Sequence, residues 1–83
     1  MGRTFKYVII SNTYPYVFSE ASTHDQHFKH CHVTSAGMGH LGVNLDGKLI
    51  VSAYGESVSL GIKSSNSDAE TLRRMFVDPF FDN

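Results

Sequence analysis

Two runs of alternating apolar and polar residues, joined by Asp46-Gly47, form the clearest pattern in the sequence. They predict a β-hairpin with a two-residue type I′ turn, because aspartate and glycine tolerate the positive φ that both central positions need. A third alternating run follows Gly55, where we expect a plain hairpin turn, or else a bulge that re-aims its neighbours. Together the runs predict the centre of an antiparallel sheet with one apolar face. The apolar positions are Leu41, Val43 and Leu45, then Leu49, Val51 and Ala53, then Val58, Leu60 and Ile62.

The segment before the hairpin divides into strands and loops. Residues 4–11 are rich in β-branched and aromatic side chains and are apolar on both faces over their second half, which is typical of a central strand. Residues 12–26 contain turn formers and predict a loop or a helical turn, with a short extended piece over 16–18. Residues 28–34 predict a further strand, and the glycines of residues 35–39 predict a flexible connection after it.

The last predicted element is an amphipathic helix that begins near Ser67. Ser67 and Glu70 have the spacing of a capping box, in which each side chain accepts a backbone N–H from the other residue. Apolar residues then recur at helical spacing and form a stripe that we expect to pack on the hairpin sheet, and Pro79 ends the helix. The stripe consists of Ala69, Leu72, Met75 and Phe76.

Strands followed by a helix predict a single domain over residues 1–83. Its class is α+β, with an antiparallel sheet of four or five strands and a C-terminal amphipathic helix packed on one face. A chain of 83 residues has a small core, and its single cysteine excludes an internal disulfide. Stability must then come from a metal, from a partner subunit or from the core alone. Cys31 itself is expected to be a buried structural residue.

Composition narrows the classes of partner. The net charge is −1 and the basic residues are scattered, which disfavours nucleic-acid binding. No apolar run has the length of a membrane span, and the first residues lack the pattern of a signal peptide. We therefore expect a cytoplasmic protein without membrane contact, and no motif requires a cofactor.

Four histidines that lie close together in the sequence are candidate metal ligands. Imidazole suits zinc, nickel or copper, and three or four such side chains make a site. Their spacing matches no standard zinc framework, so a polar strand face with solvated histidines is the alternative interpretation. The four are His24, His27, His30 and His32.

The loop before the helix is a candidate site for a phosphate-bearing ligand, because backbone amides at a helix start attract anions. Asp68 and Glu70 oppose this interpretation, since they already complement the positive end of the helix dipole. A small hydrolase or phosphate-binding protein of this kind requires His40 to lie near the helix start in one pocket. The candidate ligand-binding residues are His40, Tyr54, Lys63 and Ser64.

A strand ending in Tyr54-Gly55-Glu56-Ser57, followed by a glycine and then a helix, resembles the janus-type phosphohistidine phosphatases over Lys48 to Phe76. The resemblance implies phosphatase activity that depends on a catalytic histidine. This chain is shorter than that family, and Asn44 stands near the position where the histidine is expected, with His40 nearest to it. These departures keep the resemblance from assigning the chain to the family.

The composition favours a small non-enzymatic protein–protein interaction or regulatory module that self-associates, most simply as a twofold homodimer. Four tyrosines and six phenylalanines without a basic patch favour protein partners, either a second copy or another protein. Aromatic side chains near the C-terminus would form an exposed patch if nothing covered them. The predicted interface residues are Phe76, Phe80 and Phe81.

Overall fold

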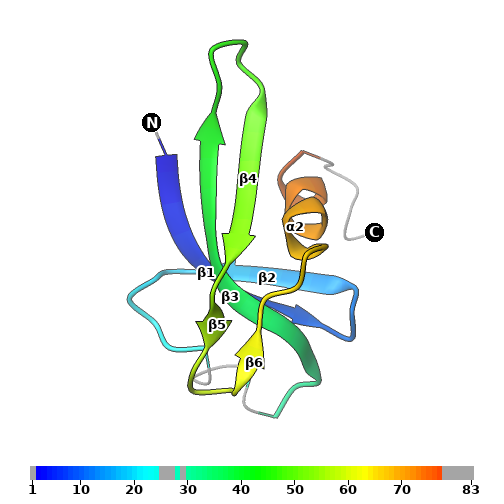
Figure 1. The fold of residues 1–83 in the computed structure, drawn as a ribbon. Helices are drawn as coiled ribbons and strands as arrows, with labels where there is room; N and C mark the ends of the chain where they lie inside the picture. The colour runs from blue at the N-terminus through cyan, green and yellow to red at the C-terminus, as the bar shows by residue number, and fades with distance from the viewer. Residues whose placement is uncertain (1, 25–27, 29, 78–83) are drawn as a thin grey trace.

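A four-stranded antiparallel sheet in the order β2-β1-β3-β4 is the main element of the computed structural model, which describes residues 2–24, 28 and 30–77 (Figure 1). A second, two-stranded sheet pairs β5 with β6, and helix α2 follows it along the chain. The arrangement confirms the predicted α+β class with a C-terminal helix. The elements are β1 (Gly2–Ile10), β2 (Tyr14–Phe18), β3 (Val33–Val43), β4 (Leu49–Tyr54), β5 (Glu56–Ser57), β6 (Ile62–Lys63) and α2 (Asp68–Val77).

β1 is a central strand, as its composition predicts, because it pairs with β2 on one side and with β3 on the other. Phe5, Tyr7 and Ile9 alternate along it and are buried on the face that α2 covers. Val8 is fully buried on the opposite face. Apolar burial on both faces is what distinguishes an interior strand from an edge strand with one solvated face.

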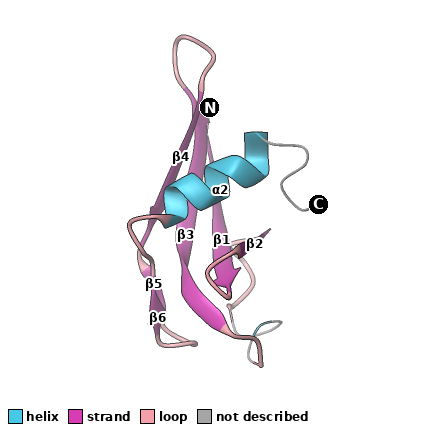
Figure 2. Cartoon of the chain, turned by 90° about the vertical axis from the view of Figure 1, so that its right-hand side faces the viewer, coloured by secondary structure: helices cyan, strands magenta, loops and turns pink. Residues whose placement is uncertain are grey.

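α2 packs across one face of the large sheet, with its axis crossing the strands (Figure 2). Leu72 is fully buried in this interface, and the rings of Phe5 and Phe76 lie 5.6 Å apart. Complete burial of a leucine side chain stabilises the fold by roughly 1.5–3 kcal/mol. The predicted helical stripe and the predicted apolar face of the hairpin therefore meet. The half-buried sheet residues in the same cluster are Leu41, Val51 and Ala53.

β3 corrects two predictions made for residues 28–39. The strand begins at Val33 rather than at residue 28, and residues 35–39, predicted to be a flexible connection, lie inside it. Neither Gly37 nor Gly39 has a positive φ, so these glycines are not there to make a turn. A Cβ at Gly39 would overlap the Phe5 ring, and a Cβ at Gly37 would overlap the carbonyl oxygen of Tyr54. Glycine is required because neighbouring groups lie directly against the strand.

β3 and β4 form the predicted hairpin, but its turn is not the predicted type I′ turn. The Gly47 N–H donates to the Asn44 carbonyl and the Asn44 N–H donates to the Lys48 carbonyl, each at 3.0 Å, so the loop has three residues, 45–47. Gly47 has φ of 78°, whereas Asp46 has no positive φ. The Asn44 side chain accounts for the difference, because its Oδ1 accepts the N–H groups of Asp46 and Lys48 at 3.0 and 2.9 Å.

The third alternating run is not the predicted strand. β5 and β6 have two residues each, and Val58, with 87% of its surface exposed, lies in the turn between them. Gly55 and Gly61 have φ of 78° and 68°, and the Gly61 N–H donates to the Ser57 carbonyl at 2.8 Å. Gly55 ends β4 and redirects the chain instead of forming the expected hairpin turn, because β5 pairs with β6 and not with β4.

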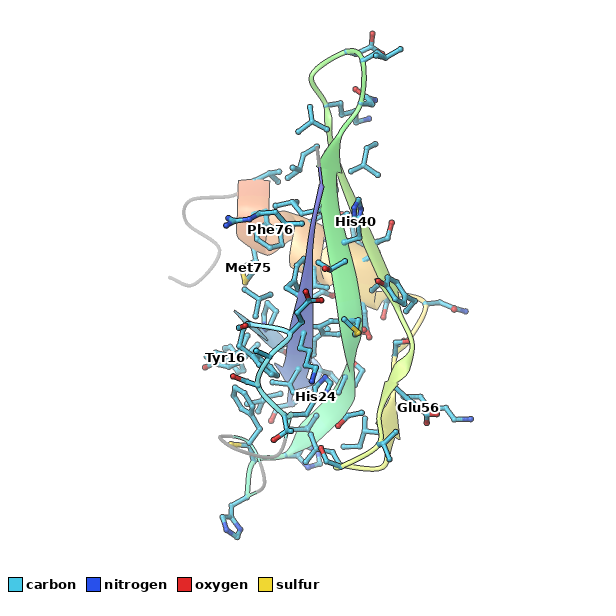
Figure 3. The ribbon with its side chains drawn as sticks, turned by 90° about the vertical axis from the view of Figure 1, so that its left-hand side faces the viewer. Tyr16, His24, His40, Glu56, Met75 and Phe76 are labelled. Atoms are coloured by element: carbon cyan, nitrogen blue, oxygen red, sulfur yellow. The ribbon has the colours of Figure 1, made fainter. Side chains whose placement is uncertain are left out.

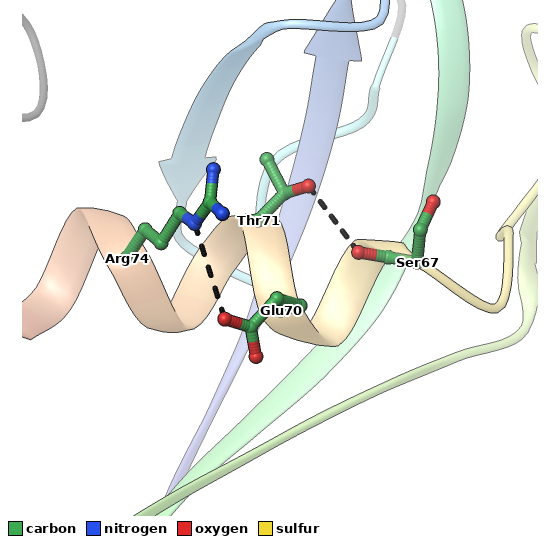
Figure 4. Close-up of polar contacts among 4 residues, drawn as sticks. All are labelled: Ser67, Glu70, Thr71 and Arg74. Carbon is green, nitrogen blue, oxygen red and sulfur yellow. Dashed lines mark hydrogen bonds and ion pairs between the residues drawn. The ribbon is translucent and has the colours of Figure 1, made fainter.

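The start of α2 also differs from the predicted capping box. Glu70 pairs with Arg74 one turn further on, at 3.9 Å on the exposed surface, and does not reach back to Ser67 (Figure 4). Reciprocal bonds form around Asp68 instead. Its Oδ2 accepts the Ser65 N–H at 2.8 Å, and its own N–H donates to the Ser65 carbonyl at 3.1 Å. The carboxylate that caps the helix start is therefore that of Asp68, which faces the sheet, and not that of Glu70, which faces solvent.

No helix in the described part of the chain is long and apolar enough to cross a membrane. The predictions made for His27, Pro79, Phe80 and Phe81 fall outside the described residues.

We expect Gly47→Ala to lower the free energy of unfolding by about 1–2 kcal/mol, because a Cβ is strained against the backbone at φ of 78°. A Cβ at this position meets no atom beyond its chain neighbours, so no clash adds to the backbone strain. Urea unfolding measures the change. Gly47→Asn is the matched control, since asparagine tolerates the left-handed conformation and should lose less stability. Wild-type stability in the alanine variant would contradict the turn geometry.

Candidate functional site

The four residues predicted to bind a ligand do not meet at one point. His40 is exposed, and its ring lies over Gly2 on the sheet face opposite α2. Ser64 is half-buried and approaches β3 from the α2 face. Lys63 is exposed on β6, and Tyr54 is exposed at the end of β4. The structure therefore does not bring His40 to the helix start, which is the condition on which this prediction depended.

The predicted metal ligands have different environments. His24 is buried, whereas His30 and His32 are exposed, and His27 lies outside the described residues. The search of the described residues finds no group of three or more histidine, cysteine, aspartate or glutamate side chains placed to hold a metal ion. Metal binding by this run stays a prediction.

The exposure of Cys31 corrects the expectation of a buried cysteine. Cys31 is exposed because it precedes β3, which begins at Val33.

A pocket of about 400 Å³ lies on the sheet face opposite α2 and brings together side chains from distant parts of the chain. Lys6 comes from β1. His24 comes from the loop after β2 and Glu56 from β5 (Figure 3). A buried histidine and a lysine thus line the same pocket. The full lining consists of Lys6, Thr23, His24, Met38, Glu56, Val58 and Ser59.

A hydrogen bond and a ring contact with other described residues hold His24 at the pocket wall. Its Nε2 lies 2.9 Å from the carbonyl oxygen of Gly37, and its ring meets the Phe18 ring edge-on with centroids 5.5 Å apart. A carbonyl oxygen only accepts, so Nε2 carries the proton, and in the neutral ring Nδ1 carries the lone pair. The bond to Gly37 thus fixes both the ring orientation and the tautomer. Such a nitrogen can accept a proton or attack an electrophile.

Lys6 brings a positive charge to the same pocket. Its side chain is half-buried, and its ammonium donates to the Ser22 carbonyl at 2.6 Å. This bond uses one of the three N–H donors of the ammonium and limits the positions that the long side chain takes. A partly buried charge is screened less by water and salt than an exposed one, so it attracts an anion more strongly. Lys6 is therefore the cationic side chain among the residues that line the pocket.

Glu56 carries the opposite charge and is exposed. Its carboxylate would repel an anion, so an anionic group fits at Lys6, with a neutral or cationic part of the ligand towards Glu56. The two-residue pairing of β5 with β6, where Glu56 lies opposite Lys63, holds this part of the wall. Met38 and Val58 supply apolar surface to the remainder of the pocket.

A buried carboxylate on the other sheet face joins the start of α2 to the strands. Asp68 accepts hydrogen bonds from the Tyr7 hydroxyl at 2.5 Å, the Ser35 hydroxyl at 2.8 Å and the Ser65 N–H at 2.8 Å. Burial raises the pKa of Tyr7 well above its usual range, and the hydrogen bond to Asp68 and its negative charge raise it further. Tyr7 therefore stays protonated and keeps donating to Asp68.

Sequence reasoning missed Lys6 and gave His24 a different role. Lys6 lies in the run TFKYVII, where a lone lysine has the pattern of a solvated strand position. Its position among apolar residues was the only local signal, because nothing nearby in the sequence connects it with His24.

Phe76, a predicted interface residue, packs in the core of its own chain against Phe5, and its predicted role in self-association stays a prediction.

Comparison with known proteins adds no further constraint. No family model matches the chain, and no curated protein and no solved structure matches it significantly.

We expect Tyr7→Phe to lower the free energy of unfolding by roughly 1–3 kcal/mol at neutral pH, because buried Asp68 loses a donor. The wild type should also lose stability above about pH 10, where tyrosine ionises in the unfolded chain while native Tyr7, with its raised pKa, keeps its proton. The variant lacks this term and should lose less over the same pH rise.

Urea unfolding of both proteins at about pH 7 and about pH 10.5 checks the two expectations, since tyrosine ionisation lies between these values. Tyr14→Phe, at an exposed tyrosine on β2, is the matched control and should follow the wild type. Equal losses in the wild type and Tyr7→Phe would contradict a raised pKa of Tyr7 in the folded protein.

Proposed function

We propose that the protein binds a small phosphate-bearing ligand in the pocket between Lys6 and His24. The observation that carries the proposal is a buried histidine, fixed by the Gly37 carbonyl, in the same pocket as a half-buried lysine. The Lys6 ammonium is a donor that suits phosphate oxygens, and the lone pair of His24 Nδ1 can accept the hydroxyl proton of a phosphate monoanion. The proposal keeps the class of ligand predicted from the sequence and replaces the predicted residues.

The pocket also limits the remainder of the ligand. Its volume of about 400 Å³ lies within the usual range for small-molecule sites. Met38 and Val58 favour an apolar portion next to the phosphate, and Glu56 favours a neutral or basic group over a second anion. We therefore expect an organic phosphate monoester or phosphoramidate to bind better than inorganic phosphate, and a diphosphate to bind less well.

A hydrolase is the enzymatic form of this proposal. His24 is the candidate catalytic group, because it is a histidine with a defined tautomer in a pocket. His40, nearest to the position expected from the resemblance, is exposed on the β3–β4 hairpin. An enzyme requires that phenyl phosphate is turned over and that His24→Asn abolishes this turnover, whereas a binding protein shows no turnover.

NMR titration with phenyl phosphate tests binding through the ring signals of His24 and the backbone signals of the pocket. We expect Lys6→Gln to weaken binding about 10–100-fold, because hydrogen bonds to charged groups contribute about 1.5–3 kcal/mol. His40→Asn is the matched control, since His40 lies on the same sheet face but outside this pocket, and it should bind like the wild type.

Two results would overturn the proposal. One is saturable binding that Lys6→Gln leaves unchanged, and the other is the absence of shifts in His24 at millimolar phenyl phosphate. Circular dichroism of each variant confirms that the fold is intact.

The second candidate function is the self-associating interaction module predicted from the composition. One observation favours it. The hairpin of β3 and β4 exposes large apolar side chains near its turn, with 58% of Val43 and the whole of Leu45 exposed. Exposed apolar side chains that lie together can form part of an interaction surface.

A further inference from the structure

The two charged side chains that line the pocket between Lys6 and His24 come from opposite sides of β3. In the β1–β3 register Lys6 lies directly opposite Met38, so both side chains are on the same face of the sheet. Met38 is in turn opposite Tyr54 at the end of β4, two residues before Glu56. The apolar side chain of Met38 therefore belongs to the strand between those that bring the cation and the anion to the pocket.

Neither of these charges is neutralised by an ion pair within the described part of the chain, where the one ion pair joins Glu70 to Arg74. The hydrogen bond from Lys6 to a backbone carbonyl leaves two of its three N–H donors for a ligand. Lys63 lies opposite Glu56 in the β5–β6 register, but it does not line the pocket. The pocket wall thus presents one positive and one negative side chain to whatever enters it.

A small molecule that carries both a phosphate and an ammonium group matches this distribution of charge. Its phosphate would pair with Lys6, and its ammonium would pair with Glu56. A phosphate ester without a cation leaves Glu56 unpaired, and a diphosphate brings a second anion towards it. Met38 and Val58 supply apolar surface that suits a short hydrocarbon linker between the two charged groups.

We infer that the ligand of this pocket is a small phosphate monoester that carries an ammonium group, with its phosphate at Lys6 and its ammonium at Glu56. The inference rests on the proposed function, phosphate binding at Lys6, and names the class of ligand. Glu56 becomes the residue that determines specificity, because it distinguishes a ligand with a cationic end from one with an apolar end of the same size.

NMR titration of the full chain with aminoethyl phosphate and with propyl phosphate tests the inference, because the first has an ammonium where the second has a methyl group. At about pH 8 both phosphates are fully ionised and the amine is protonated. We expect the wild type to bind aminoethyl phosphate about twofold to fivefold more tightly, the effect of an exposed ion pair. The apolar wall alone would favour propyl phosphate, so the sign of the preference is informative.

Variants of single charges then test the role of Glu56. Glu56→Gln should abolish the preference for aminoethyl phosphate without weakening propyl phosphate, because it removes the charge of an exposed side chain and keeps its shape. Asp46→Asn is the matched control, since Asp46 is an exposed carboxylate outside the pocket, and it should keep the preference. Lys63→Gln should keep or increase it, because the cation opposite Glu56 no longer competes with the ligand.

The outcomes separate the class of ligand from the function on which it rests. If neither compound binds, phosphate binding in this pocket is overturned, and the inference with it. If both bind in a way that depends on Lys6 but aminoethyl phosphate is not preferred, the inference alone is overturned and the proposed function stands. A preference that Glu56→Gln retains, or that Asp46→Asn also removes, overturns the inference as well. Loss of the preference in Glu56→Gln, with the control unchanged, supports it.

Discussion

The Asp68 carboxylate is the contact on which the rest of the structure depends. It is almost fully buried and accepts hydrogen bonds from Tyr7 on β1, Ser35 on β3 and Ser65 at the start of α2. A buried carboxylate that loses a donor is strongly destabilising, so these bonds allow only one position for the start of the helix on the sheet. From that position Leu72 and Phe76 reach the Phe5–Tyr7–Ile9 row, and the core closes.

Gly37 connects this core with the pocket on the opposite face. A side chain there would overlap the Tyr54 carbonyl on the α2 side, and the carbonyl oxygen of Gly37 itself accepts from His24. One residue therefore lets the end of β4 approach β3 and also sets the tautomer of the pocket histidine. The two faces of the sheet differ in what covers them. α2 covers one face, and the other has an open pocket between Lys6, His24 and Glu56.

The tip of the β3–β4 hairpin is a third surface, and its chemistry differs from that of the pocket. The pocket combines charge with a fixed imidazole, as ligand sites do, whereas the tip exposes the apolar side chains of Val43 and Leu45, as interaction surfaces between proteins do. The proposed phosphate-ligand binding and the proposed self-association use different parts of the molecule, so the two proposals are compatible in one chain. Variants at Lys6 and at Leu45 separate them.

The sequence by itself determined the elements whose signal is periodic and local. Alternation marked the central strand β1 and the hairpin of β3 and β4, and helical spacing marked Ala69 to Phe76, because each period aligns apolar side chains on one face. Tertiary structure decided the features for which a local pattern allows more than one structure. Asn44 turned a two-residue hairpin loop into a three-residue loop, and Gly37 and Gly39 extended a strand through a segment with the composition of a loop. The helix start moved from Ser67 and Glu70 to Asp68 because a carboxylate facing Tyr7 and Ser35 is held by groups distant in sequence. The pocket could not be predicted from local sequence, because its residues are distant along the chain. Lys6 and His24 come together only when β1, the loop after β2 and β3 are packed.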